Sequence, residues 1–446
     1  MTRLLYSLFM RLAQPLLRRK LRQRGRQEPG YLAAIEERFG HYAACAPAPH
    51  GMTVWVHAVS LGETRACAVL VSRLRQQLPD MRLLLTHGTA TGRAEGASLL
   101  QPGDIQSWQP WDTPAAVQRF LDHFKPSIGI LMETELWPNL VAGCQRREVP
   151  LVLANARLSD KSLRQAQRLA WLARPAYRSL TAVWAQTQAD AQRLTQLGAP
   201  VQGVFGNLKF DATPNPEQLA TGRAWGSRAG RPVVMFASSR EGEEETLLQF
   251  LESFRPLAPV DSAQLAINSI ANEIQWLIVP RHPQRFDAVA ALIEQHGFVV
   301  SRRSDWDDGP IRGEAADTRT IWLGDSLGEM ALYYGLADVA LLGGSFAPLG
   351  GQNLIEAAAC ACPVVMGPHT FNFAEAAELA EAAGAALRAP SLQEAVAVAQ
   401  TLVSDPAAHA SRVNAAAGFS RAHRGAVEKT VAAVAALLGQ QAVDAL

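Results

Sequence analysis

The sequence places carboxylates directly after runs of apolar residues. SLGET at 60–64 puts Glu63 after the apolar run 53–59, and METELWPN at 132–139 puts Glu133 after a second run. The N–H groups and dipole at a helix start favour an ionised carboxylate, which can then take a proton from a hydroxyl as a general base. A purely structural role is the alternative, because Ser60 and Glu63 also fit an S-x-x-E capping box, and the acids of METELWPN fit a helix cap.

Basic residues occupy comparable positions. Lys209 lies in GNLKFD at 206–211, and Arg281 follows an apolar run that ends at Pro280 in VPRHPQRF. Lysine can neutralise a phosphate or carboxylate, and arginine is the preferred partner of anionic groups such as phosphate. The bland alternative for Lys209 is an ordinary linker lysine.

Two glycine-containing segments predict a nucleotide site. Gly343-Gly344-Ser345 ends an apolar run, and GGQNLIEAA at 350–358 then opens a helix with Glu356 one turn in. A helix start of this kind binds anions, and a carboxylate there suits ribose hydroxyls. GDSLGEM at 324–330 could present backbone groups to a base, or could be another capped helix start. Neither GxGxxG nor a P-loop is present.

The elements that must position these residues alternate between strand and helix. Apolar runs at 53–59, 81–87, 127–133, 150–156 and 182–187 each precede a helical pattern, and the rhythm resumes after a Gly- and Pro-rich break at 206–232. It continues with runs at 232–239, 275–282, 297–302, 320–326, 338–345 and 363–368. Such alternation predicts two doubly wound α/β domains with a hinge near 205–215, and ligands in a cleft at the carboxyl ends of the strands.

Composition excludes several classes of protein. The chain has 446 residues, 48% of them hydrophobic, and a net charge of +1, so nothing global argues for nucleic-acid binding. Its five cysteines form neither a zinc pattern nor a disulfide framework, which indicates a reducing, cytoplasmic compartment.

The N-terminus pairs an apolar run with a basic one. LLYSLFMRLAQPLL at 4–17 is shorter than the roughly 20 residues that a spanning helix needs. RRKLRQRGR at 18–26 then supplies six basic residues and no acid. The pattern favours a helix lying in the cytoplasmic leaflet of a membrane. In the alternative, the helix packs on the protein's own core and its basic face is solvated.

Together these motifs resemble the 3-deoxy-D-manno-octulosonic acid (Kdo) transferases of lipopolysaccharide synthesis. The residues that carry the resemblance are SLGET, METELWPN, NLKFD at 207–211, VPRHPQRF, GDSLGEM and MGPHTFNF at 366–373, with ERFG at 37–40 and the N-terminal apolar run. The resemblance implies a GT-B fold of two Rossmann-like domains. It places a membrane-associating segment at 1–45, the acceptor domain at 46–208 and the donor domain, which binds CMP-Kdo, at 209–446.

The resemblance also implies an activity. Kdo would pass from CMP-Kdo to a tetraacylated lipid A precursor, lipid IVA, at the cytoplasmic face of the inner membrane, with inversion of the anomeric centre. Glu63 would be the general base, and Glu133 and Lys209 would stabilise the transition state. The residues implied in CMP-Kdo binding are Pro280, Arg281, Leu327, Gly328, Glu329, Asn353, Leu354, Ile355 and Glu356. No cofactor or metal is expected, because cationic side chains and helix starts can hold the donor's charges and no DxD-like cluster is apparent.

One stretch departs from the family pattern. PLAPVDSAQLAINSIANEIQ at 256–275 is longer than expected and is predicted to lie on the surface of the donor domain. Two alternatives to the transferase remain at this level. One is another GT-B enzyme, such as a UDP-sugar epimerase or a different lipid-linked glycosyltransferase. The other is a non-catalytic, membrane-associated lipid-binding or scaffold protein, against which the intact Glu63, Glu133 and Lys209 argue.

Overall fold

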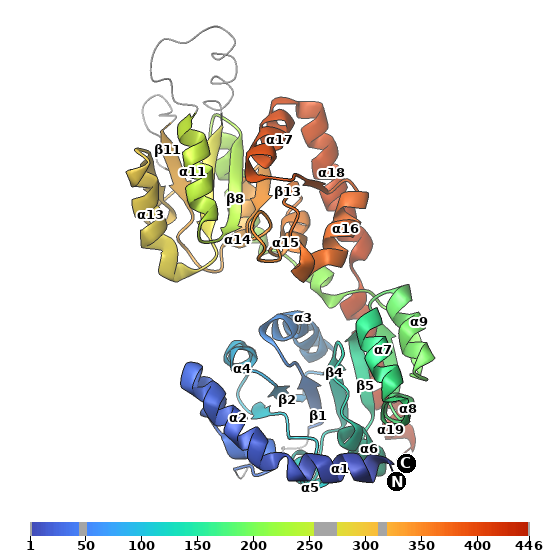
Figure 1. Cartoon of the computed structure of the whole chain (residues 1–446). Helices are drawn as coiled ribbons and strands as arrows, with labels where there is room; N and C mark the ends of the chain where they lie inside the picture. The colour runs from blue at the N-terminus through green and yellow to red at the C-terminus, as the bar shows by residue number, and fades with distance from the viewer. Residues whose placement is uncertain (1, 44–50, 254–273, 311–318, 445–446) are drawn as a thin grey trace, which may run out of the picture. The chain divides into compact units, whose positions relative to one another are not determined.

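The chain folds into two compact units, each built on a parallel sheet (Figure 1). The computed structural model describes residues 2–43, 51–253, 274–310 and 319–444. The first unit comprises residues 1–211 and 423–446, and the second comprises residues 212–422. The long stretch at 256–275 lies outside the described residues except for Ile274 and Gln275.

The first unit contains a seven-stranded parallel sheet with the strand order β3-β2-β1-β4-β5-β6-β7. Its strands are β1 (Thr53–His57), β2 (Arg82–His87), β3 (Ile105–Trp108), β4 (Ile128–Met132), β5 (Leu151–Ala156), β6 (Ala182–Ala185) and β7 (Val201–Val204). The order runs outward from β1 to β3 and then returns to β4 on the other side of β1. Such a reversal leaves a crevice at the carboxyl ends of the two central strands, β1 and β4.

Helices cover both faces of this sheet. The helices of this unit are α1 (Thr2–Leu12), α2 (Gln14–Gln27), α3 (Leu61–Gln77), α4 (Ala90–Ala97), α5 (Pro114–Phe124), α6 (Pro138–Arg146), α7 (Asp160–Arg168), α8 (Ala170–Arg178), α9 (Gln188–Gln196) and α19 (Ala426–Asp444). Three short 3₁₀ helices join them: η1 (Pro29–Leu32), η2 (Ile35–Phe39) and η3 (Leu208–Asp211). Strand β1 is buried along its whole length, as a strand covered on both faces must be.

The division differs from the predicted one at the C-terminal end, because the last helix returns to the first unit (Figure 1). Val431 and Val434 of α19 join a buried cluster that includes Val54 of β1. The carboxylate of Asp211 accepts hydrogen bonds from the N–H groups of Gly425, at 2.5 Å, and Val427, at 2.7 Å. Packing thus assigns residues 423–446 to the first unit, whereas the sequence-based boundary placed them in the second.

The second unit repeats the architecture, with the strand order β10-β11-β9-β8-β12-β13-β14. Its strands are β8 (Val233–Ser239), β9 (Gln275–Pro280), β10 (Val299–Arg302), β11 (Thr320–Leu323), β12 (Val339–Leu342), β13 (Val364–Met366) and β14 (Ala386–Arg388). Its helices are α10 (Pro216–Arg228), α11 (Glu243–Ser253), α13 (Phe286–Gln295), α14 (Met330–Leu336), α15 (Leu354–Ala359), α16 (Ala374–Ala382), α17 (Leu392–Ser404) and α18 (Pro406–His423), with 3₁₀ helices η4 (Pro283–Arg285), η5 (Arg303–Asp305) and η6 (Phe371–Phe373). The reversal here falls between β8 and β12.

The N-terminal helices combine a docked side with an exposed apolar stripe. Ser7 of α1 hydrogen-bonds Oδ1 of Asn139 at 2.9 Å, and Leu21 of α2 is buried. No described helix is both long and apolar enough to cross a bilayer. The exposed apolar side chains recur at helical spacing, and they are Leu4, Leu5, Leu8, Phe9, Leu12 and Leu16.

Candidate active site

Glu63 lies in the first turn of α3, just beyond the end of β1. Ser60 is the N-cap of this helix, and its Oγ accepts the N–H of Glu63 at 3.3 Å. The hydroxyl of Ser60 donates to Oε1 of Glu63 at 2.8 Å, and the N–H of Val59 donates to Oε2 at 2.9 Å. Ser60 therefore caps the helix as predicted, but the Glu63 carboxylate accepts the N–H of Val59 and not the N–H of Ser60 that a capping box uses. The same contacts fix the orientation of the carboxylate.

The protonation of Glu63 differs from the expectation based on the helix start. Burial raises the pKa of Glu63 to about 7, although the hydrogen bonds from Val59 and Ser60 act in the opposite direction. The charges of Glu133 and Glu135 add to the increase. Desolvation of the charged form outweighs the donors at the helix start. A carboxylate with a pKa near 7 is well matched to general base catalysis at neutral pH.

Glu133 follows β4, the strand that pairs with β1 at the reversal point. Its φ angle of 59° lies in the left-handed region, which a side chain other than glycine rarely occupies. Asn155, at the end of the neighbouring β5, has a φ angle of 52°. Such strained residues cost about 1–3 kcal/mol each and concentrate at functional sites.

Lys209 lies in η3 and reaches the end of β4. Its Nζ is 3.5 Å from Oε1 of Glu133, and the two side chains are 29% and 20% exposed. The helix η3 is anchored by the N–H of Leu208, which donates to Oδ1 of Asn155 at 3.0 Å. A partly exposed pair of this kind contributes at most about 1 kcal/mol. This contribution does not offset the cost of the backbone strain at Glu133. The pair therefore serves to place the charges of Lys209 and Glu133 and does little to stabilise the fold.

The three predicted catalytic residues thus belong to one unit, and electrostatic coupling links Glu63 to Glu133, which pairs with Lys209. A fourth group, Glu135, was visible in METELWPN but was not predicted as a site residue. Burial raises the pKa of Glu135, and its charge helps to raise that of Glu63. The arrangement can accept a proton at Glu63, and it places a positive charge beside Glu133.

The predicted nucleotide residues follow strands of the second unit that lie close in its sheet order. Pro280 ends β9, and Arg281 comes next. Leu327, Gly328 and Glu329 follow β11, and the segment from Asn353 to Glu356 follows β12. The sheet runs β11-β9-β8-β12, so these residues follow the carboxyl ends of neighbouring strands on both sides of β8.

Local contacts order two of these segments. Asn353 caps α15, because its Oδ1 accepts the N–H of Ile355 at 3.2 Å, and its Nδ2 donates to Oε1 of Glu356 at 2.9 Å. Glu329 pairs with Arg303 at 2.9 Å and accepts the hydroxyl of Ser326. Gly328 has a φ angle of 78°, which favours glycine at this position.

The loop after β8, which the sequence analysis overlooked, occupies the centre of this edge. The N–H of Gly344 donates to Oε2 of the buried Glu243 at 2.8 Å, and the N–H of Arg240 donates to the same oxygen at 3.0 Å. Glu244, also buried, pairs with Arg285 at 2.6 Å. The acid run EGEEE directly after an apolar strand was the available signal. Two of its acids hold the loops together.

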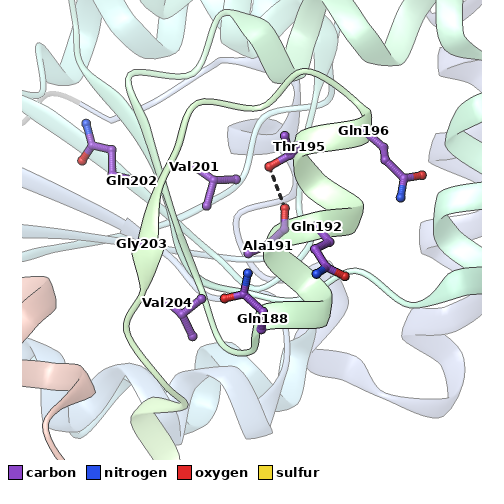
Figure 2. A pocket seen from close by; sticks show the side chains of 9 residues that line it. All are labelled: Gln188, Ala191, Gln192, Thr195, Gln196, Val201, Gln202, Gly203 and Val204. Carbon is purple, nitrogen blue, oxygen red and sulfur yellow. Dashed lines mark hydrogen bonds between the residues drawn. The ribbon is translucent and has the colours of Figure 1, made fainter.

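A separate hollow lies between α9 and the edge strand β7 (Figure 2). Polar amide side chains line much of it, and the hydroxyl of Thr195 donates to the carbonyl of Ala191 at 2.8 Å. None of its lining residues is a predicted site residue. Among the described residues, no group of three His, Cys, Asp or Glu side chains could hold a metal ion.

The two doubly wound parallel-sheet domains give the class of fold, which resembles that of the GT-B glycosyltransferases. The UDP-GlcNAc 2-epimerase from Neisseria meningitidis superposes with a TM-score of 0.51 and 13% identity over 87% of this chain and 100% of that chain. This likeness shows the shared fold.

Sequence comparison then gives the family. The model of the 3-deoxy-D-manno-octulosonic-acid transferase (kdotransferase) family matches residues 33–212. The 3-deoxy-D-manno-octulosonic acid transferase of Bordetella pertussis is 44% identical over 98% of this chain and 100% of that protein. The enzyme of the same name from Haemophilus influenzae is 33% identical over 84% of each. The chain belongs to the Kdo transferase family, glycosyltransferases of lipopolysaccharide biosynthesis.

Proposed function

We propose that this Kdo transferase uses CMP-Kdo as the donor and a lipid A precursor, lipid IVA, as the acceptor, and that it inverts the anomeric centre with Glu63 as the general base. The observation that carries the proposal is the Glu63 carboxylate. It is held at both oxygens, its pKa is raised to about 7 by burial, and it lies at the reversal point of a doubly wound sheet.

In the proposed reaction, a carboxylate oxygen of Glu63 takes the proton of an acceptor hydroxyl. The hydroxyl oxygen attacks the anomeric carbon of Kdo, and the bond from that carbon to the CMP phosphate breaks from the opposite face. The electron pair leaves with CMP. Lys209, whose Nζ lies 3.5 Å from Oε1 of Glu133, would stabilise the negative charge that develops in the transition state.

We assign the donor to the second unit. Arg281 would bind an anionic group of CMP-Kdo, and Pro280 would shape the loop that carries it. Glu356, oriented by Asn353 at 2.9 Å, would accept hydrogen bonds from the ribose hydroxyls. The segment Leu327-Gly328-Glu329, of which Leu327 and Gly328 are exposed, would present its backbone to the base. The start of α15, at Leu354 and Ile355, would favour the phosphate.

We assign the acceptor to the first unit and the protein to the cytoplasmic face of the inner membrane. The stripe of α1 exposes apolar side chains whose transfer out of water is favourable by about 1.5–3 kcal/mol for each fully buried one. Beside it, a hollow on α2 is lined by Pro15, Arg18, Arg19, Arg22, Gln23 and Arg26. Each basic residue near an anionic surface adds about 1 kcal/mol. Such a surface suits a protein whose acceptor is a lipid.

The test is direct assembly of the reaction. Purified protein is incubated with CMP-Kdo and lipid IVA, and the lipid products are analysed by mass spectrometry and by NMR at the anomeric position. We expect a mass increase corresponding to Kdo and an anomeric configuration opposite to that of the donor. A folded, CMP-binding preparation that yields no Kdo-bearing lipid would contradict the proposed donor and acceptor, and retention of configuration would contradict the mechanism.

A further inference from the structure

The hydroxyl of Ser60 contacts both ends of Glu63. Its oxygen accepts the backbone N–H of Glu63 at 3.3 Å, and its proton is directed to Oε1 of the same residue at 2.8 Å. Oε2 is engaged separately by the N–H of Val59 at 2.9 Å. Each carboxylate oxygen therefore has one donor from the turn after β1 and retains a lone pair for a substrate proton.

The turn that supplies these donors is itself fixed. The carbonyl of Val59 accepts the N–H of Thr89 at 3.0 Å and the hydroxyl of Thr89 at 2.8 Å. The carbonyl of Ser60 accepts the hydroxyl of Thr64 at 2.9 Å. Bonds on both sides hold Val59 and Ser60 in place, so the donors to Glu63 are organised before any substrate binds.

A second helix start with the Ser-x-x-Glu pattern shows what capping alone requires. At the start of α17, Ser391 accepts the N–H of Glu394 at 3.2 Å, but its hydroxyl lies 3.5 Å from Oε1 of that exposed glutamate. Both serines cap a helix. At the start of α3 the hydroxyl of Ser60 also makes a close bond to a half-buried carboxylate. A hydrogen bond to a charged group gains strength where water is excluded.

We propose that Ser60 is a positioning residue of the transfer reaction, whose hydroxyl orients the Glu63 carboxylate and stabilises its ionised form. This inference rests on the proposed function in that Glu63 is taken as the base. The acceptor O–H bond breaks and a new O–H bond forms on Glu63, while the hydroxyl of Ser60 keeps its own proton throughout. The hydrogen bond that the Ser60 hydroxyl donates lowers the pKa of Glu63, although burial raises this pKa by a larger amount.

The test compares variants of Ser60 in the full-length protein. Ser60→Gly removes the hydroxyl with little loss of capping, because glycine is tolerated at an N-cap, and Ser60→Ala removes both. We expect the acid limb of the kcat/KM profile to move to higher pH by about 1–2 units, the shift that corresponds to losing a hydrogen bond to a charged group. Activity then falls more at pH 6.5 than at pH 8.5. Ser60→Thr keeps the hydroxyl and should restore the limb.

Ser391→Ala is the matched control, because it removes a cap of the same layout and should leave the limb unmoved. If Ser60→Gly and Ser60→Ala lower the rate equally at every pH, or leave the limb in place, the hydroxyl acts only as a cap and the inference is overturned. Glu63→Gln separates this failure from failure of the proposed function. If Glu63→Gln is fully active, Glu63 is not the base and the proposed function fails. If Glu63→Gln is inactive but the acid limb of Ser60→Gly does not move, only the role proposed for Ser60 fails.

Discussion

The Nζ atom of Lys209 lies 3.5 Å from Oε1 of Glu133, although 76 residues separate them in the chain. The contact joins η3 to the end of β4, where Glu133 adopts a φ angle of 59°. Because the pair is partly exposed, its contribution to stability is small, and its effect should appear in the reaction.

Lys209→Met should therefore lower kcat by about 100-fold or more, the usual cost of removing one group that stabilises developing charge. Thermal stability should change little, and Lys209→Arg should recover part of the rate because it retains the charge. Steady-state kinetics with saturating donor measures the effect. Lys161→Met, which removes an exposed lysine of α7, is the control. A Lys209→Met enzyme with wild-type kcat would show that the pair has no part in the chemistry.

Glu63→Gln should stabilise the first unit at high pH. The pKa of Glu63 is raised from 4.5 to about 7 in the folded state, so the folded protein binds more protons between these values. The stabilising effect of this carboxyl is full below its unfolded pKa and is lost as the pH rises through about 7. Glutamine stays neutral, so its advantage should be close to zero at pH 4 and reach up to about 3 kcal/mol at pH 8.

Hydrogen exchange of the β1 amides at the two pH values measures this difference. The control is Glu394→Gln, which alters an exposed capping glutamate and should give no gain at pH 8. Equal stability of Glu63→Gln and the wild type at pH 8 would argue against a desolvated Glu63.

The N-terminal helices should bind anionic bilayers through two separable contributions. Leu5→Glu with Leu12→Glu should reduce binding to vesicles at every salt concentration, because it places charge in the apolar stripe. Arg19→Gln, Arg22→Gln and Arg26→Gln together should reduce binding on the order of 100-fold, at about 1 kcal/mol per charge, only with anionic lipid and low salt.

Vesicle sedimentation measures both effects. Val299→Glu with Leu379→Glu, two exposed apolar positions of the second unit, makes the same charge change elsewhere and should leave binding intact. Wild-type binding by both N-terminal variants would place the membrane contact on another surface.

Much of the architecture could be predicted from local pattern. The predicted apolar runs in both halves correspond to strands, since buried parallel strands are nearly continuous apolar runs. The overlooked strands are short or mixed: β3 reads IQSW, β7 reads VQGV and β14 reads ALR. The return of α19 to the first unit was not predictable, because Val434 joins the buried cluster that contains Val54 only through packing between distant parts of the chain.

Prediction of the candidate active site from the sequence has the same limit. Position after an apolar run singled out Glu63 and Glu133 as candidates, because the carboxyl ends of parallel strands share an edge. Lys209 was singled out by its place in the break between the predicted domains, and the catalytic roles of all three residues came from the family resemblance. The raised pKa of Glu63 could not be predicted in this way, because it depends on burial and on the charges of Glu133 and Glu135, which follow β4. The role of the acid run EGEEE was not predicted either, because local sequence does not show that Glu243 is buried against the N–H of Gly344.

The pH dependence of kcat/KM for Kdo transfer tests the central claim most directly. If Glu63 is the base, kcat/KM should rise tenfold per pH unit at low pH and level off above about 7, where the carboxyl is ionised. Glu133→Gln should move this limb to lower pH, because the charge of Glu133 raises the pKa of Glu63. Glu63→Gln should lose activity at least 100-fold and show no such limb. A wild-type profile that is flat from pH 5 to 8, or a Glu63→Gln enzyme that keeps the wild-type rate and limb, would contradict the assignment.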